Sequence, residues 1–290
     1  MKSTFVTYLY IVFILLFALS SCEDDVDLKD LGVESKLVLY CRLSPDLDTI
    51  SAYLTNSQPI LGGSSEEVSI IKNATVEISS DNANWMNLTY NSIKNRYTLP
   101  QSEFSISEGK TYFIRAHSPN YKKTIFSFCT VPYYRDVQMK IEHKESIYGE
   151  IEVNFIWKDY PNEKNFYLIS AYSIHQETGL GDGHIWYIPV LSDSTQDYLF
   201  TDINQDGATM KGVYTAYSND DTLIFNFIQI DEPTYLFEKS IYYNYYIDFM
   251  GFVEPTLVYN NIKDGYGLFS AFRFKTYRYI FKTNTLEEVN

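Results

Sequence analysis

Strand-like runs alternate with turn signals from residue 36 to residue 132. Within the runs apolar and polar positions alternate, as around Val76 and Ile78 and again around Tyr112 and Ile114. Successive side chains of a strand point to opposite faces, so this alternation predicts strands that bury one face. The turns between the runs are rich in Gly, Ser, Asp and Asn, and their regular spacing is typical of two packed sheets. We therefore predict an immunoglobulin-like β-sandwich over residues 36–132.

The second half, residues 133–290, begins with the same pattern and then departs from it. Trp157 lies in the first of its strand-like runs and is expected to pack between two sheets. Asp231 and Pro233 then provide a helix N-cap and a proline for the first turn. Aromatic and apolar residues follow at spacings of three and four, which predicts one helix up to about residue 248. Because aromatic residues also favour strands, a strand is the alternative there. The predicted fold class is mainly β, with a β-rich second domain that contains this helix.

An apolar segment opens the chain and stops at a cysteine. Lys2 precedes an uncharged stretch from Tyr8 to Leu19, and small residues separate that stretch from Cys22. The stretch suits the core of a secretory signal and is too short to span a bilayer as a helix. The letters LSSC that end at Cys22 resemble a bacterial lipobox, in which the cysteine thiol is acylated and the chain is cut just before it. We predict a signal peptide at residues 1–21 and a palmitate-type lipid anchor on Cys22.

Acidic residues follow the predicted lipidation site at once. Glu23, Asp24 and Asp25 lead a charged segment that we expect to act as a tether over residues 22–35. Like charges repel one another and extend such a tether. The same acids resemble the surface-export signal of Bacteroidota lipoproteins. The two interpretations are compatible, and together they predict a lipid-anchored outer-membrane protein that faces the cell surface.

Net charge excludes one class of partner, whereas the aromatic content leaves several open. The chain has 23 Lys+Arg against 37 Asp+Glu, a formal net charge of −14. Binding to nucleic acid requires clustered cations, so we expect no nucleic-acid partner. Aromatic residues make up 17% of the chain, with 27 tyrosines. They suit half-buried strands and equally suit a recognition surface, and composition does not separate the two.

Two cysteines remain beyond Cys22. Cys41 and Cys129 both lie in strand-like runs of the predicted sandwich. An exported chain enters an oxidising compartment, where a disulfide between them is permitted. Two buried free thiols are the alternative, because cysteine is among the residue types most often buried.

The C-terminal part carries an ordered motif. Residues 254–272, EPTLVYNNIKDGYGLFSAF, contain Glu-Pro, an apolar segment, an Asn-Ile step and Gly-x-Gly-hydrophobic-Phe. This order, with Asn73–Glu77 and Ser107–Tyr112 upstream, resembles domain-of-unknown-function family 4249. The resemblance implies an outer-membrane lipoprotein with an immunoglobulin-like N-terminal half, commonly associated with TonB-dependent transporters and without an assigned biochemical activity. Cys41 departs from the family pattern, in which a small residue, usually glycine, stands at that position.

One loop has the residue types of a calcium site. Residues 202–207 match the first six positions of an EF-hand-like loop, D-x-N-x-D-G. In such a loop the side-chain oxygens, here those of Asp202, Asn204 and Asp206, surround calcium, and Gly207 allows the sharp turn. The twelfth position of such a loop is a carboxylate, whereas this chain has Val213, and strands are predicted on both sides. A polar hairpin turn explains the same letters. We expect no cofactor, with a weak calcium site at these residues as the alternative.

The sequence contains no G-x-S-x-G nucleophile elbow, and its adjacent acid pairs read as solvated charge. We therefore predict that the protein is not an enzyme. The leading hypothesis is a binding or accessory subunit that works beside a TonB-dependent outer-membrane transporter. The alternatives are a structural or adhesion module of the cell envelope and a surface glycoside hydrolase whose two acids lie far apart in sequence. We expect the partner surface on a cluster of C-terminal tyrosines: Tyr242, Tyr243, Tyr245, Tyr246 and Tyr266.

Overall fold

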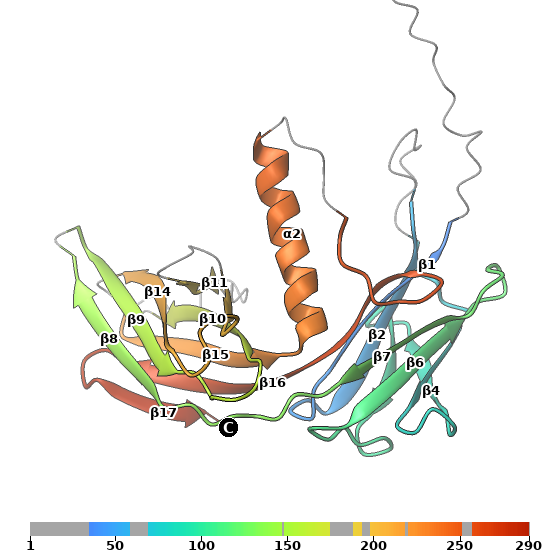
Figure 1. Cartoon of the computed structure of the whole chain (residues 1–290), viewed down its shortest axis with the longest axis horizontal. Helices are drawn as coiled ribbons and strands as arrows, with labels where there is room; N and C mark the ends of the chain where they lie inside the picture. Colours follow the sequence, from blue (N-terminus) through green and yellow to red (C-terminus); the bar gives the residue numbers. More distant parts are fainter. Residues whose placement is uncertain are drawn as a thin grey trace, which may run out of the picture. The chain divides into compact units, whose positions relative to one another are not determined.

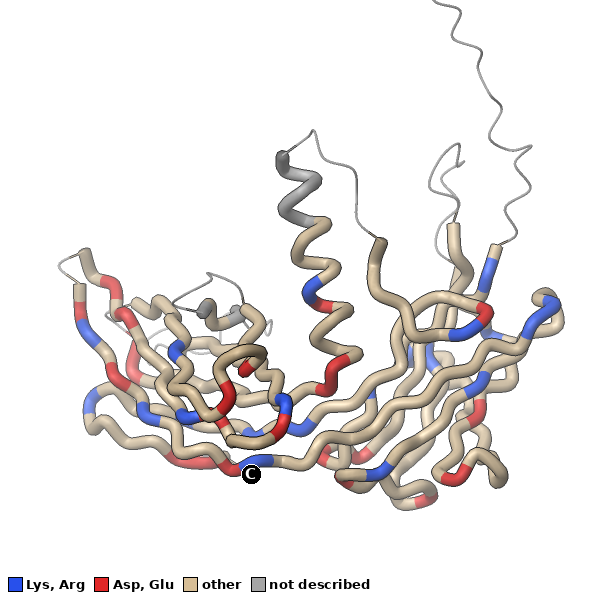
Figure 2. Tube along the Cα trace, in the orientation of Figure 1, with Lys and Arg blue, Asp and Glu red and all other residues tan. Residues whose placement is uncertain are grey.

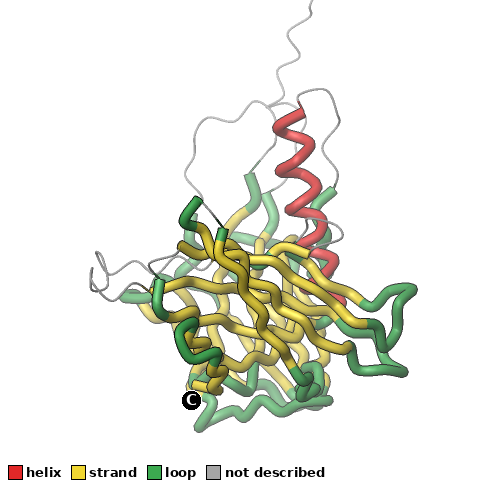
Figure 3. Tube along the Cα trace, turned by 90° about the vertical axis from the view of Figure 1, so that its left-hand side faces the viewer, coloured by secondary structure: helices red, strands yellow, loops and turns green. Residues whose placement is uncertain are grey.

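A computed structural model describes residues 35–58, 69–146, 148–174, 188–192, 198–217, 220–250 and 257–289. Within these residues the protein is mainly β, which confirms the predicted fold class. Helix α2 (Glu232–Met250) lies where the aromatic spacing predicted a helix, so the strand alternative is wrong. Figure 3 shows this helix (red) extending from a body of strands (yellow). The predicted signal peptide and most of the predicted tether lie outside the described residues.

The predicted sandwich contains the first seven strands, and each has one buried face. In β1, for example, Leu37, Leu39, Cys41 and Leu43 are buried and the residues between them are half-buried. The strands pair in the order β1-β2-β5-β4-β3-β6-β7 (Figure 1). Their bounds are β1 (Leu37–Leu43), β2 (Thr49–Asn56), β3 (Thr75–Ser79), β4 (Met86–Asn91), β5 (Arg96–Pro100), β6 (Thr111–His117) and β7 (Ile125–Thr130).

The second half builds another core between two sheets. One sheet has the order β12-β14-β9-β8, and the other continues the first sheet through β16, β15, β10 and β11, with β13 also paired to β10. Trp157 is buried, with its ring centroid 5.9 Å from that of Tyr167 and 5.6 Å from that of Phe227, so its predicted place between sheets is confirmed. The bounds are β8 (Met139–Glu145), β9 (Glu150–Lys158), β10 (Phe166–Ile174), β11 (Ile188–Pro189), β12 (Leu191–Ser192), β13 (Leu199–Thr201), β14 (Thr209–Tyr217), β15 (Thr222–Ile230), β16 (Tyr266–Ile280) and β17 (Thr285–Val289).

Strand β16 belongs to both cores. Its first part, Tyr266–Ala271, pairs in parallel with β1, and its second part, Phe272–Ile280, pairs antiparallel with β15. Ile262, Phe269 and Ala271 are buried among the core residues of the sandwich. The segment predicted as the first domain therefore shares its core with C-terminal residues.

Asp231 begins helix α2 as the sequence predicted. One carboxylate oxygen accepts hydrogen bonds from the backbone N–H of Thr234 at 2.9 Å and from its hydroxyl at 2.6 Å, which is the N-cap arrangement. The other oxygen accepts the N–H of Ala271 in β16 at 2.8 Å. Burial raises the pKa of Asp231 to about 6, although its hydrogen bonds with Thr234 and Ala271 act in the opposite direction. The same carboxyl group thus starts the helix and fixes it to β16.

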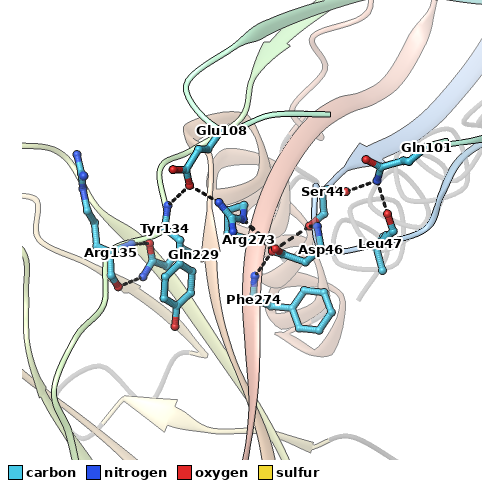
Figure 4. A network of polar contacts seen from close by, with 10 residues as sticks. All are labelled: Ser44, Asp46, Leu47, Gln101, Glu108, Tyr134, Arg135, Gln229, Arg273 and Phe274. Atoms are coloured by element: carbon cyan, nitrogen blue, oxygen red, sulfur yellow. Dashed lines mark hydrogen bonds and ion pairs between the residues drawn. The ribbon is translucent and has the colours of Figure 1, made fainter. Parts of the chain in front are cut away.

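Polar contacts join the two halves at the middle of β16 (Figure 4). The guanidinium of Arg273 donates to Asp46, in the β1–β2 connection, at 2.9 Å and to Glu108, in the β5–β6 connection. Asp46 also accepts the backbone N–H of Phe274 at 2.9 Å, and Glu108 accepts that of Tyr134 at 3.2 Å. The side chains of Arg273 and Asp46 are only 18% and 20% exposed, so water screens their attraction less than on an open surface.

Two glycines allow β16 to approach its neighbours. Gly267 has a φ of 119°, and a Cβ atom there would lie 1.9 Å from the carbonyl oxygen of Leu39. A Cβ atom on Gly265 would lie 2.7 Å from both the carbonyl oxygen of Leu37 and a methyl group of Ile125. Any side chain at these positions would push β16 away from β1.

We predict that Gly267→Ala lowers the free energy of unfolding by about 3 kcal/mol or more, because it combines backbone strain with a steric clash. Denaturant titration of the chain from residue 22 onward measures this change. Gly149→Ala is the matched control, because Gly149 also has a positive φ of 79° but lies in the β8–β9 turn. Equal losses in the two variants would contradict the close packing of β16 on β1.

Candidate functional site

The cysteines of the sandwich are free thiols. Cys41 and Cys129 are both buried and unbridged, so the structure has the second of the two predicted alternatives and no disulfide. Burial raises the pKa of the Cys41 thiol to about 12 and raises that of Cys129 well above its usual value. Both groups are therefore protonated, unreactive members of the core. The lipidation and export residues Cys22, Glu23, Asp24 and Asp25 lie outside the described residues.

The predicted calcium loop gains a third carboxylate from elsewhere in the chain. Asp159, which follows β9, lies with Asp202 and Asp206 so that one oxygen of each falls within 4.8 Å of the others. Asn204 is exposed in the same loop, with a φ of 71°. The sequence motif did not reveal Asp159, although its position opposite the start of β14 follows from the pairing of β9 with β14.

Hydrogen bonds account for much of this acidic cluster. Asp159 accepts the Tyr167 hydroxyl at 2.7 Å and the Gly207 N–H at 3.0 Å. Asp202 accepts the N–H of Asn165 at 3.0 Å, so the carboxylates tie the β9–β10 and β13–β14 connections together. Burial raises the pKa of Asp202, and the neighbouring charges of Asp159 and Asp206 raise it further. Oxygen ligands of this kind suit a hard cation such as calcium, and the hydrogen bonds equally suit a polar loop clamp.

The expected tyrosine surface is only partly exposed. Tyr243 on α2 and Tyr266 at the start of β16 are 50% and 44% exposed. Tyr242 is half-buried, with its ring centroid 5.4 Å from that of Tyr198. Tyr245 and Tyr246 belong to α2, but their side chains lie outside the described residues. A partner surface on these tyrosines stays a prediction.

A row of aromatic rings stands on the outer face of the sandwich. Phe113 of β6 stacks on Phe126 of β7 at 6.2 Å between centroids and lies 6.3 Å from Phe128, while Trp85 contacts Phe126 at 6.5 Å. Phe128 is 60% exposed. We call Trp85, Phe113, Phe126 and Phe128 the aromatic row. The sequence contained a signal for this row. In β7 the aromatic residues Phe126 and Phe128 alternate with residues that are buried on the other face.

A cation borders the aromatic row. The guanidinium of Arg115 lies 4.2 Å from the ring centroid of Trp85, a cation–π arrangement. The same group forms an ion pair with Glu77 at 2.6 Å. The row therefore presents flat apolar rings beside a neutralised charge pair, a composition typical of the centre of a protein interface.

A small pocket lies beside the junction of the two halves. Its volume is about 190 Å³, below the roughly 300 Å³ at which pockets for drug-sized ligands begin. The pocket's size therefore does not favour a large organic substrate. It is lined by Pro132, Tyr133, Glu163, Lys164, Asn165, Phe166, Gln229 and Ile230.

A comparison with protein families decides the relationship that the C-terminal motif suggested. The profile of a domain of unknown function, DUF4249, matches residues 23–278. The chain belongs to this family. The match covers most of the sequence and confirms the resemblance. No curated protein compared with the chain gives a significant match.

The structure explains the DUF4249 residues that the sequence singled out. Gly265 and Gly267 permit the close approach of β16 described above. The side-chain amide of Asn261 accepts the N–H of Phe269 at 2.9 Å and donates to its carbonyl oxygen at 2.7 Å. Ile262 and Phe269 fill the sandwich core. The C-terminal motif therefore encodes the insertion of β16 into the first sheet, a structural role.

Among the described residues, the structure contains no helix with both the length and the apolar character needed to cross a membrane.

We predict that Asp202→Asn raises the thermal midpoint at pH 7 in the presence of a chelator. Its raised pKa means that ionisation of Asp202 costs stability as pH rises through its titration, and the amide removes that cost while still accepting the Asn165 N–H. Calcium should then raise the midpoint of the wild-type chain and leave that of the variant unchanged if the cluster holds the ion. A variant less stable than wild type in chelator would show that the carboxylate is needed in the loop clamp itself.

Proposed function

We propose that this DUF4249 protein is a lipid-anchored, non-enzymatic binding protein of the outer membrane that works as an accessory subunit beside a TonB-dependent transporter. The lipobox-like letters that end at Cys22 support the anchor, and Glu23, Asp24 and Asp25 support export to the cell surface. A lipid anchor confines the protein to one membrane and raises its effective concentration beside other proteins of that membrane.

The observation that carries the binding role is the aromatic row. The exposed face of a sheet in a soluble protein is usually polar, because aromatic rings stabilise the fold when they are buried in its core. Here Phe128 and its neighbours stand on the face opposite the core residues Ile125 and Cys129. Rigid rings gathered on one face lose little conformational entropy on contact, so they suit the recognition of another protein.

The partner proposed for the aromatic row is the extracellular surface of the transporter. The body of a lipid-anchored protein stands above the bilayer. The loops of membrane barrels reach the same height, so the two can meet there. The charges of Arg115 and Glu77 beside the row neutralise each other. The contact is therefore driven by burial of the rings rather than by charge.

We predict that Cys22→Ala abolishes acylation. The thiol is the nucleophile that would become the thioether, and alanine cannot replace it. Metabolic labelling with a palmitate analogue, followed by gel fluorescence, measures the modification. Label on the alanine variant would end the lipoprotein proposal, whereas wild-type label that disappears in the variant supports it.

We also predict that Phe113→Ala combined with Phe128→Ala lowers the yield of a crosslinked transporter at least tenfold, because each ring in an interface centre contributes about 2 kcal/mol. Mild crosslinking at native expression, followed by purification and mass spectrometry, measures the yield. Tyr148→Ala is the matched control, because Tyr148 is 83% exposed in the β8–β9 turn. Equal thermal midpoints of the variants exclude unfolding as the cause, and recovery of the wild-type protein alone would overturn the partner.

A further inference from the structure

Helix α2 begins near the end of strand β1. Asp231, before the helix, bonds to Ala271, whose register partner in β1 is Leu43 at the end of that strand. Further along the helix, Phe237 contacts Tyr40 at 5.8 Å between ring centroids. The helix therefore advances in the direction of the start of β1, and Figure 1 shows the helix beside the sandwich, with its last turns and the start of β1 both toward the upper side of the view. We call this the anchor end, because the described chain begins there at Ser35.

Apolar and tyrosine side chains are exposed at the anchor end. Residues 257–260 include a contact with the helix, in which the N–H of Tyr259 donates to the Ser240 hydroxyl at 3.0 Å. In that segment Leu257 is 96% exposed. The other exposed members are Ile241, Tyr243, Val258 and Tyr266. Aliphatic residues beside tyrosines are the composition of side chains that lie at a membrane–water interface.

Lysines surround the same end, in a protein with a net charge of −14. The ammonium of Lys36 lies 4.9 Å from the ring centroid of Tyr266, and Lys123 forms an ion pair with Asp264 at 2.6 Å. The pKa of Asp264 is lowered, first by its hydrogen bond with Lys123 and further by the positive charges of Lys123, Lys263 and Lys36. In Figure 2 positions of Lys and Arg (blue) lie around the start of β1.

We propose that the anchor end docks on the headgroup–acyl boundary of an anionic bilayer, the membrane that holds the protein's own lipid. Exposed apolar side chains rimmed by lysines fit this boundary, because the apolar groups enter the acyl region while the cations meet lipid phosphates. This inference rests on the lipid anchor of the proposed function. Cys22 precedes Lys36 by 36 − 22 = 14 residues, which span at most about 50 Å even when fully extended. The bilayer is therefore always within reach of this end.

The other occupant that this surface could take is a protein, in particular the transporter. The lysines favour the bilayer, because they meet the phosphates of any anionic lipid without a defined register. The exposed side chains also come from three parts of the chain: α2, residues 257–258 and the start of β16. The aromatic row adjoins this end, because Phe126 pairs with Lys263 through a β-bridge, while its rings stand on the outer face of β6 and β7.

The test uses the mature chain with Cys22→Ser, so that no acyl chain holds it to the vesicle. The vesicles contain phosphatidylcholine and roughly one third phosphatidylglycerol, the anionic lipid to which lysines respond. We expect Tyr243→Trp to be quenched by brominated acyl chains beyond the quenching of the parent tryptophans. Tyr133→Trp is the matched control, because Tyr133 is 53% exposed and packs beside Gly109, which bonds to Val131 at the other end of β7.

Charge is tested separately from insertion. Neutralising Lys36 and Lys263 together to Gln should weaken binding to these vesicles about thirty-fold, since each lysine near an anionic surface contributes about 1 kcal/mol. The double change Lys140→Gln and Lys158→Gln, on β8 and β9, should leave the binding within about twofold of the parent.

Equal quenching at positions 243 and 133, or no quenching at either, would overturn the proposal. If position 243 shows no quenching with lipid alone but forms a crosslink to the transporter, the occupant of this surface is a protein and not the bilayer. Because the Cys22→Ser chain carries no acyl group, these results do not depend on lipidation. A failure here is thus distinguishable from a failure of the acylation experiment, which would remove the anchor itself.

Discussion

The parallel pairing of β1 with β16 joins residues from the two ends of the described chain, and most of the fold is arranged around it. A parallel pair requires a long crossover, and here the crossover contains the strands from β2 to β15 as well as α2. Gly267 lets the two backbones approach, while Asn261 satisfies both backbone polar groups of Phe269 on the edge of β16 that faces away from β1. The amide side chain takes the place of a neighbouring strand at Phe269, so both backbone polar groups of this residue are paired.

Several connections are fixed where β16 passes from one core to the other. Ala271 holds Asp231 and thereby the first turn of α2, and Arg273 holds the connections that contain Asp46 and Glu108. The side chains of Arg273 and Asp46 are largely withdrawn from water, so losing one partner would leave the other charge poorly solvated. The family motif ends at Phe272, next to this group of contacts. The motif therefore has a structural role in this chain, because it fixes the position of β16.

The alternation of apolar and polar residues predicted the strands of the sandwich, because each has one buried face. The same rule missed β16, where Leu268, Phe269, Ser270 and Ala271 are buried consecutively and show no alternation. Asp159 was missed because its place beside Asp202 is set by the pairing of β9 with β14, which no local motif encodes. Composition also could not sort the tyrosines. Tyr97 is buried with its hydroxyl bonded to the carbonyl oxygen of Ile71 at 2.9 Å, whereas Tyr243 is half exposed.

The two proposed contacts use different aspects of the same sandwich, and this geometry bears on how they would coexist. The anchor end lies at the start of β1, whereas the aromatic row lies on the outer face of β6 and β7. The side chains on a sheet face stand roughly perpendicular to the strands, so a face and a strand end point in different directions. A body that stands on the bilayer by its strand ends therefore directs its sheet faces along the membrane plane. In that orientation the aromatic row faces neighbours embedded in the same membrane, with Phe126 nearest the lipid contact, because Phe126 pairs with Lys263.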